Sequence, residues 1–245
     1  MKVPGVQDFP YCWFAGEHKG DSIMRNVLIG LGALFILGLC AGNSFADKYT
    51  PGVYKGSDPG RNTAKHPGNI SVEVTVDANA ITDIKITDFV QTEKGKQAER
   101  NAEAKATIPA AILEKQSLDV DSVAKASLSS VGIELAVAEA LHKATVAYKD
   151  GVYKGSASGY NKPPKHPGAI DVEVTIAGGK ISDIKVVTFK QTDKGKQAAK
   201  NASVKEKVPA DIVAAQSTAV DSVAKATLAS GGIKLAVARA LEKAR

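Results

Sequence analysis

Alternating apolar and polar residues mark the same short segment twice in the chain. Positions 70–76 read Ile-Ser-Val-Glu-Val-Thr-Val, and positions 170–176 read Ile-Asp-Val-Glu-Val-Thr-Ile. A period of two predicts a β-strand with one buried face. A turn signal, Ala-Gly-Gly-Lys at 177–180, and apolar segments at 81–89 and 181–189 come next. Each copy therefore predicts an antiparallel hairpin, more strongly in the second, where paired glycines suit a tight turn.

Helical features follow each hairpin. A polar segment rich in Lys and Ala, 91–101 and its repeat, predicts a short exposed helix or an ordered loop. Pro109 and Pro209 suit the first turn of a helix, so they predict helices over 110–116 and 210–216.

The closing segment of each unit has the spacing of an amphipathic helix. Apolar residues at i, i+4 and i+8 run through 132–141 and 232–241, and each of these segments opens on glycine. Strands followed by helices predict an α+β fold: a small antiparallel sheet with helices packed on one face, in two tandem copies.

The part of the chain that carries these features consists of two tandem copies of one unit. Lys65-His-Pro-Gly recurs as Lys165-His-Pro-Gly, and the offset of 100 holds from there to the end. Repeats of this size indicate two tandem domains rather than a solenoid, whose repeats are far shorter. We expect domains at 47–147 and 148–245, joined by a short junction that keeps them close.

The segment before these domains, 1–46, is predicted to be a leader outside the fold. An apolar run of 13 residues at 27–39 follows a Met24-Arg-Asn start. It is shorter than the roughly 20 residues that a membrane-spanning helix needs, but it suits the core of a signal peptide. We predict a signal peptide over 24–46 and a true start at Met24 rather than upstream of it. Lipidation at Cys40 is the alternative.

Composition and charge argue against several classes of protein. The net charge of +6 comes from 32 basic and 26 acidic residues spread along the chain. No stripe of basic and aromatic residues stands out, so we do not expect nucleic acid binding. Both cysteines, Cys12 and Cys40, lie in the predicted leader, which leaves no thiol for a disulfide, an iron–sulfur cluster or haem attachment. A single histidine per unit before Pro-Gly, His66 or His166, does not make a metal site, and none is predicted.

A ten-residue stretch at 121–130, repeated at 221–230, is the strongest candidate for binding. The copies read Asp-Ser-Val-Ala-Lys-Ala-Ser-Leu-Ser-Ser and Asp-Ser-Val-Ala-Lys-Ala-Thr-Leu-Ala-Ser. A hydroxyl beside a helix start suits a phosphate, because backbone N–H groups there lack intrahelical partners and the helix dipole favours an anion. The candidate residues form two matching sets: Asp121, Lys125, Ala126, Ser127 and Ser130; and Asp221, Lys225, Ala226, Thr227 and Ser230.

Two pairs among these residues also have plainer explanations. Ser130 and Ser230 suit the N-cap of the closing helix, a role that is compatible with phosphate contact. Asp121 and Asp221 suit local turns. Both explanations stay open beside the binding hypothesis.

The order of features in each unit resembles the FMN-binding domain family. The Gly-Val-Tyr-Lys-Gly segment, the hairpin, the Gln-Ser pair and Asp-x-x-x-x-Ala-Thr before an alanine-rich helix carry the resemblance over about 51–144 and 150–245. That family includes the covalent-flavin subunits of sodium-pumping quinone reductases and domains fused to extracytoplasmic fumarate-reductase-like enzymes. The resemblance implies that Thr227, and Ser127 in its place in the first unit, carry FMN through a phosphoester bond installed by a flavin transferase.

The chain departs from the family's motif at its centre. Ala124-Lys125 and Ala224-Lys225 stand where Ser/Thr-Gly is usual. A glycine there would allow a positive φ or a tight approach of the backbone, which lysine tolerates poorly. A lysine ammonium two residues before the hydroxyl can in turn pair with a phosphate.

The resemblance implies an exported flavoprotein of the periplasm or cell surface that relays electrons. It would be a carrier rather than an enzyme, with FMN supplying the redox chemistry and the protein supplying tethering and electrostatics. Its expected partners are a flavin transferase for attachment and membrane or extracytoplasmic redox proteins as electron donor and acceptor. Two alternatives stay open: a binding or structural module without the cofactor, and a flavin-dependent reductase component.

Overall fold

The computed structural model describes residues 47–61, 67–160, 168–192 and 194–245. The predicted leader with Cys12 and Cys40, and the two histidines His66 and His166, lie outside these residues. In the described part of the chain, no helix combines the length and the apolar character needed to cross a membrane.

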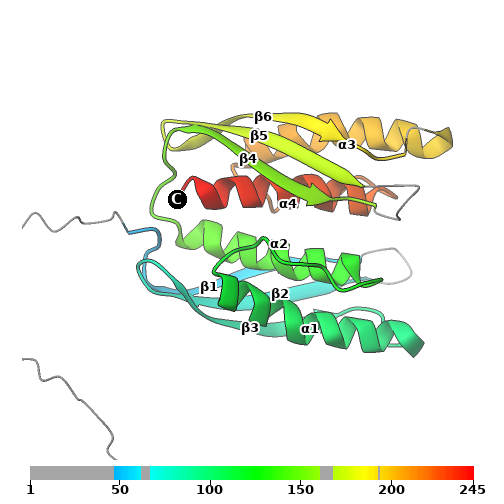
Figure 1. Cartoon of the computed structure of the whole chain (residues 1–245), viewed down its shortest axis with the longest axis horizontal. Helices are drawn as coiled ribbons and strands as arrows, with labels where there is room; N and C mark the ends of the chain where they lie inside the picture. Colours follow the sequence, from blue (N-terminus) through cyan, green and yellow to red (C-terminus); the bar gives the residue numbers. More distant parts are fainter. Residues whose placement is uncertain (1–46, 62–66, 161–167, 193) are drawn as a thin grey trace, which may run out of the picture. The chain divides into compact units, whose positions relative to one another are not determined.

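Each unit folds as a three-stranded antiparallel sheet with two helices (Figure 1). The first unit contains β1 (Gly52–Asp58), β2 (Asn69–Val76), β3 (Ile81–Val90), α1 (Gly95–Lys115) and α2 (Ser127–Ala144). The second contains β4 (Gly151–Ser158), β5 (Ala169–Ala177), β6 (Lys180–Phe189), α3 (Gly195–Ala215) and α4 (Thr227–Lys243). The predicted α+β fold in two copies is confirmed, and so are both hairpins.

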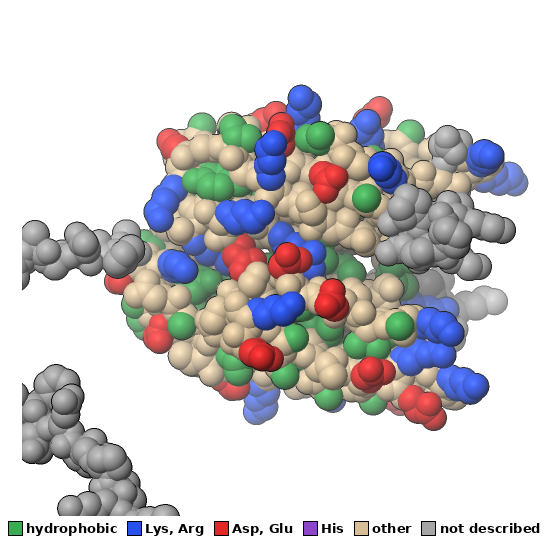
Figure 2. Space-filling model, viewed as in Figure 1, with side chains coloured by type: hydrophobic (Ala, Val, Ile, Leu, Met, Phe, Trp, Pro, Cys, Tyr) green, Lys and Arg blue, Asp and Glu red, His purple; other side chains and the backbone are tan. Residues whose placement is uncertain are grey.

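One face of each sheet is buried against its helices. In β2 every second residue from Ile70 to Val76 is buried, and in α2 the residues Ile133 and Val137 are fully buried. The opposite face is open, as shown by Val53, whose side chain is 60 % exposed. The alternation that predicted the strands therefore separates the core from solvent. Outside the core, basic and acidic side chains are interspersed over the face seen in Figure 2.

The closing helix lies on the sheet at a point where the strand has no side chain. Gly56 of β1 packs directly on α2, and a Cβ at this position would collide with the backbone carbonyl of Ala136. Gly155 of β4 makes the same contact with Ala236 of α4. Because backbone meets backbone here, these glycines fix how closely each helix approaches its sheet.

The segments 110–116 and 210–216 are helical up to Lys115 and Ala215, but the predicted helix starts after Pro109 and Pro209 are wrong. A single helix replaces the polar segment and the short helix, so that Pro109 lies inside α1 and Pro209 inside α3. A proline in a helix interior removes one hydrogen bond and costs about 3 kcal/mol. The buried face of α1 continues through the proline, with Ile108 and Ile112 on either side of it, and this packing holds the helix together.

The closing helices begin earlier than the glycines indicated. α2 and α4 start at Ser127 and Thr227 rather than at Gly132 and Gly232. The glycine of the first unit lies inside its helix, where a Cβ would meet the Cα of Gly60 at 2.8 Å. These glycines therefore allow close packing and do not mark the helix start.

The two units pack together through α2 and α4. Val131 and Leu135 of α2 belong to the apolar core of the second unit, and Ala238 of α4 belongs to that of the first. Matching positions on the two helices carry unlike charges. Lys234 binds Asp58 through a buried ion pair of 2.7 Å, whereas its counterpart Glu134 binds Arg239 at 3.0 Å (Nη2 to Oε2). The two units, which are otherwise near copies of each other, thus differ at the interface between them.

Among the described residues, Glu134 is the acid whose pKa departs furthest from its ordinary value. Its side chain is inaccessible to solvent, and among these residues its Oε1 has no hydrogen-bond partner. Burial raises the pKa of Glu134 to about 8, because desolvation of the carboxylate outweighs the attraction of Arg239; the nearby Asp119 and Asp121 raise it further.

We expect Gly56→Ala to destabilise the fold by about 3 kcal/mol or more, because the new methyl group meets backbone that cannot rotate away. Urea unfolding followed by circular dichroism measures the change. Gly52→Ala is the matched control: it lies on the same strand, and its Cβ would meet only the edge of the Tyr54 ring at 3.3 Å. Equal stability of the two variants would contradict the close backbone contact.

We expect Glu134→Gln to become increasingly more stable than wild type as the pH rises from about 4.5 to about 8. In this range the unfolded chain has released the Glu134 proton while the folded chain retains it, so wild-type stability falls by at most about 1.4 kcal/mol per pH unit. Denaturant unfolding at a series of pH values measures the difference. The exposed Glu114→Gln serves as control, with a curve parallel to wild type; a constant offset for Glu134→Gln would contradict the raised pKa.

Candidate cofactor site

The motif loop is tied to the sheet at its beginning and to the helix at its end. Gln216 ends α3 in the left-handed region (φ 54°), and its side-chain amide exchanges two hydrogen bonds of 2.8 Å with the backbone of Ile181 in β6. Farther along, the N–H of Val223 donates to Oγ of Ser230 at 3.0 Å. The first unit repeats these contacts through Gln116 and Ser130. The loop is therefore held at both ends.

The hydroxyls that the sequence predicts as FMN acceptors stand on the first residue of each closing helix. Ser127 is exposed and Thr227 is half-buried. The residues before them, Ala126 and Ala226, are buried and occupy the N-cap positions without a side-chain cap. The N–H groups of the first helical turn therefore have no intrahelical partner and no capping oxygen, which is the arrangement that binds an anion.

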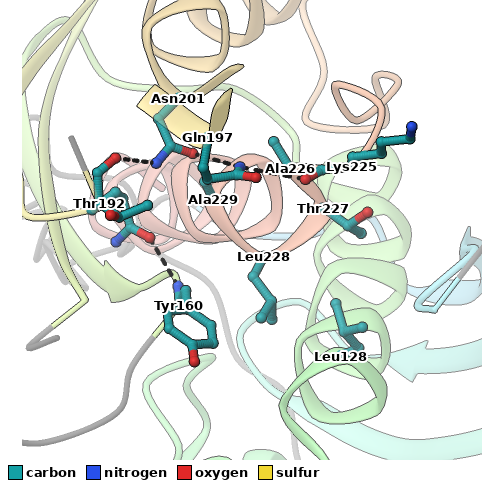
Figure 3. Close-up of a pocket in the computed structure, with 11 residues that line it drawn as sticks. Leu128, Tyr160, Thr192, Gln197, Asn201, Lys225, Ala226, Thr227, Leu228 and Ala229 are labelled. Atoms are coloured by element: carbon teal, nitrogen blue, oxygen red, sulfur yellow. Dashed lines mark hydrogen bonds between the residues drawn. The ribbon is translucent and has the colours of Figure 1, made fainter. Parts of the chain in front are cut away.

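Lys125 and Lys225 adopt the backbone conformation that glycine favours. Their φ angles are 65° and 63°, both in the left-handed region. An L-residue pays a steric cost there of roughly 1–2 kcal/mol because its Cβ crowds the backbone. The loop thus keeps the shape that the family's glycine would allow. Figure 3 shows the Lys225 side chain extending away from Gln197 and Asn201.

A pocket of about 420 Å³ opens beside Thr227 in the second unit (Figure 3). Its polar side is a connected set of amides: Asn201 donates to the carbonyl of Thr192 at 2.7 Å and accepts from Gln197 at 3.2 Å. Gln197 also donates to the carbonyl of Lys225 at 3.3 Å. This network joins the end of the sheet, α3 and the motif loop. Its apolar side is formed by Leu128, Ala226, Leu228 and Ala229.

A matching but smaller pocket, about 260 Å³, lies beside Ser127 in the first unit. Asn101 there donates to the carbonyl of Thr92 at 2.8 Å and accepts from Gln97 at 3.0 Å. Ser129 adds a hydrogen bond to Asn101 at 2.9 Å that its alanine counterpart in the second unit cannot make. The two sites therefore share a plan and differ in detail.

The two pockets adjoin each other. Leu128 of α2, Leu228 of α4 and Tyr160 line both of them. The leucines directly follow Ser127 and Thr227 in sequence, and Figure 3 shows them lying next to each other. Each site is thus completed by a residue from the other unit.

The remaining predicted residues lie beside the pockets rather than in them. Ser130 and Ser230 are fully buried in the first helical turn and accept a loop N–H, so they are not the N-cap residues that we expected as an alternative. Asp221 is exposed and borders another cavity, of about 920 Å³, which Lys225 and Thr227 also line. Asp121 is exposed as well.

Several pocket residues escaped the sequence analysis. Thr92, Gln97 and Asn101, with their counterparts in the second unit, lie in the polar segment that we had interpreted as an exposed helix or loop. Their signal was present: glutamine and asparagine recur at i and i+4, identical in both copies. That spacing places both side chains on one face of a helix, and both face the motif loop.

Comparison with known proteins identifies the family. A family model described as FMN-binding domain matches residues 66–142 and again 166–242. The chain belongs to the FMN-binding domain family. It is also 40 % identical over 95 residues to an uncharacterized protein of Treponema pallidum (strain Nichols). That match covers 39 % of this chain and 23 % of the relative, so the chain spans less than a quarter of that protein's length.

FMN is the cofactor of this family, and the residues of both pockets fit it. The uncapped helix start suits a phosphate, the amide and hydroxyl groups suit the polar parts of the molecule, and the leucine and alanine side chains suit the flat ring. The larger pocket has a volume within the range of about 300–1,000 Å³ that small-molecule sites occupy. Among the described residues, no group of three or more His, Cys, Asp or Glu side chains could hold a metal ion.

We expect Lys225→Gly to raise the free energy of unfolding by about 0.5–1 kcal/mol, because glycine removes the steric cost of a positive φ and loses only part of that gain to its greater freedom in the unfolded chain. Denaturant unfolding of the flavin-free protein measures the effect. Lys225→Ala removes the same charge but keeps the Cβ, so it should show no such gain. Equal stability of the two variants would mean that the loop carries no strain at this position.

Proposed function

We propose that this protein is an exported electron carrier that holds FMN at the start of each closing helix, through phosphoester bonds to Thr227 and Ser127. The observation that supports this most directly is the position of the hydroxyls. Each is the first residue of a helix whose N-terminus lacks a side-chain cap, and each lies at the wall of a pocket lined by amides and apolar side chains. A tethered phosphate would meet the unpaired N–H groups there.

Attachment uses the hydroxyl as a nucleophile. The oxygen of Thr227 forms a bond to phosphorus and gives up its proton, while the bond from phosphorus to the leaving group breaks. Because a phosphoester does not form from free phosphate in water to a useful extent, the FMN donor must be an activated phosphoanhydride, which a flavin transferase would supply. The exposed loop before the helix gives such an enzyme access, since Ala224 and Lys225 are both exposed.

Once bound, FMN supplies reversible electron uptake, and the protein contributes position and polarity. The network of Gln197, Asn201 and the Thr192 carbonyl would orient the cofactor's polar groups. Leu128 and Leu228 would exclude water from the space between the two sites. Two cofactors bound in adjoining pockets are suited to a relay, because electrons can pass between them without a diffusing intermediate.

Export follows from the predicted signal peptide at 24–46, and it would place the carrier in the periplasm or at the cell surface. A covalent tether suits that location, because a cofactor lost outside the cytoplasm is not easily replaced. The electron donor and acceptor would be membrane or extracytoplasmic redox proteins. Nucleic acid is not among the proposed partners.

Intact-mass analysis of the exported protein, made with and without a flavin transferase, tests the attachment. We expect two FMN increments with the transferase and none without it. Thr227→Ala should remove one increment and Ser127→Ala the other, whereas Thr227→Ser keeps a hydroxyl and should retain its increment. An unchanged mass for Thr227→Ala would place the bond elsewhere, and a chain without any added mass in the presence of transferase would overturn the proposal.

A further inference from the structure

The two flavin sites differ in charge at a matching position on their rims. Arg61 follows Gly60 in the first unit, and Tyr160 follows Gly159 in the second. The backbone N–H of Arg61 donates to Oε1 of Gln91 at 3.1 Å, and that of Tyr160 donates to Oε1 of Gln191 at 2.9 Å. The backbone therefore holds both residues in the same place, and only the side chains differ.

The side chains distribute charge unequally between the pockets. Arg61 lines the pocket of the first unit, where its guanidinium donates to Oγ1 of Thr92 at 3.3 Å. With Lys125 it gives that pocket two cationic residues, whereas Lys225 is the one cationic residue on the described wall of the other pocket. Tyr160 lines both pockets and brings no positive charge to either.

We propose that Arg61 makes the two flavins inequivalent by raising the reduction potential of the one in the first unit above that of the one in the second. This rests on the proposed function. Taking up two electrons and one proton adds one negative charge to a flavin ring near neutral pH. A fixed positive charge at the rim stabilises that product by Coulomb attraction. Arginine stays protonated at any pH of interest, so its effect persists.

The inequivalence gives the relay a direction. At equilibrium with a chemical reductant, electrons occupy the flavin of the first unit before that of the second. The second unit is then the entry site and the first unit the site from which electrons leave. Because Arg61 is exposed, salt should weaken its influence, and the gap between the two potentials should narrow as the ionic strength rises.

Chains that carry a single flavin test the proposal. Ser127→Ala leaves the second site, and Thr227→Ala combined with Ser127→Thr leaves the first; intact mass confirms one FMN increment in each. Dithionite titration with redox dyes then gives each potential. We expect a higher potential at the first site, lowered by Arg61→Tyr and kept by Arg61→Lys. Tyr160→Arg should raise the potential of the second site, and that of the first as well, because residue 160 lines both pockets.

The outcomes separate this inference from the proposed function. If each chain carries its increment and Arg61→Tyr leaves the potential and its salt dependence unchanged, the role of Arg61 is overturned while the carrier stands. If both single-site chains lack flavin, the carrier itself is overturned, and the assignment of Arg61 is overturned with it. A shift with Arg61→Lys as large as that with Arg61→Tyr would show that shape, not charge, sets the potential.

Discussion

Direct contact between strand backbone and helix backbone determines the geometry of each unit. Gly56 and Gly155 let the closing helices settle on their sheets at the shortest separation that the chain permits. The helix axis is then fixed relative to the sheet, and the position of its first residue is fixed with it. A cofactor attached to that residue would be positioned by a packed helix, which holds it more precisely than a loop would.

Duplication has been followed by divergence where the units touch. The cores and the amide networks are nearly identical, whereas the matching positions 134 and 234 of the two central helices carry an acid and a base. A buried ion pair is not in itself a large source of stability, because both partners lose their hydration. What the ion pair of Lys234 with Asp58 and the hydrogen bond between Arg239 and Glu134 specify is which surfaces meet. A lysine at position 134, as at the matching position of the second unit, would have placed a like charge against Arg239.

Local patterns predicted the sheets well and the helices less well. A period of two and a Gly-Gly turn are read within a few residues, and Gly178 and Gly179 do adopt the positive φ angles of 60° and 71° that the turn needs. Pro109 gave a wrong helix start because the helix continues on both sides of the proline. Burial of Ile108 and Ile112 stabilises it there, and such a tertiary contact cannot be predicted from a local pattern. Gly132 gave a wrong start for the closing helix, because this glycine is needed for close packing against Gly60, which is far away in sequence. The amides of the pocket were missed for the same reason, since a glutamine on a helix acquires a role only when a loop folds over it.

The leucines that follow Ser127 and Thr227 make the two halves of the chain depend on each other. Leu128 closes a pocket whose other walls belong to the second unit, and Leu228 closes the pocket of the first unit together with Gly159 and Tyr160. A chain cut back to either half would lose a wall of the chamber it kept and open the apolar side of that chamber to bulk water. Each half of the chain therefore depends on the other for a complete chamber.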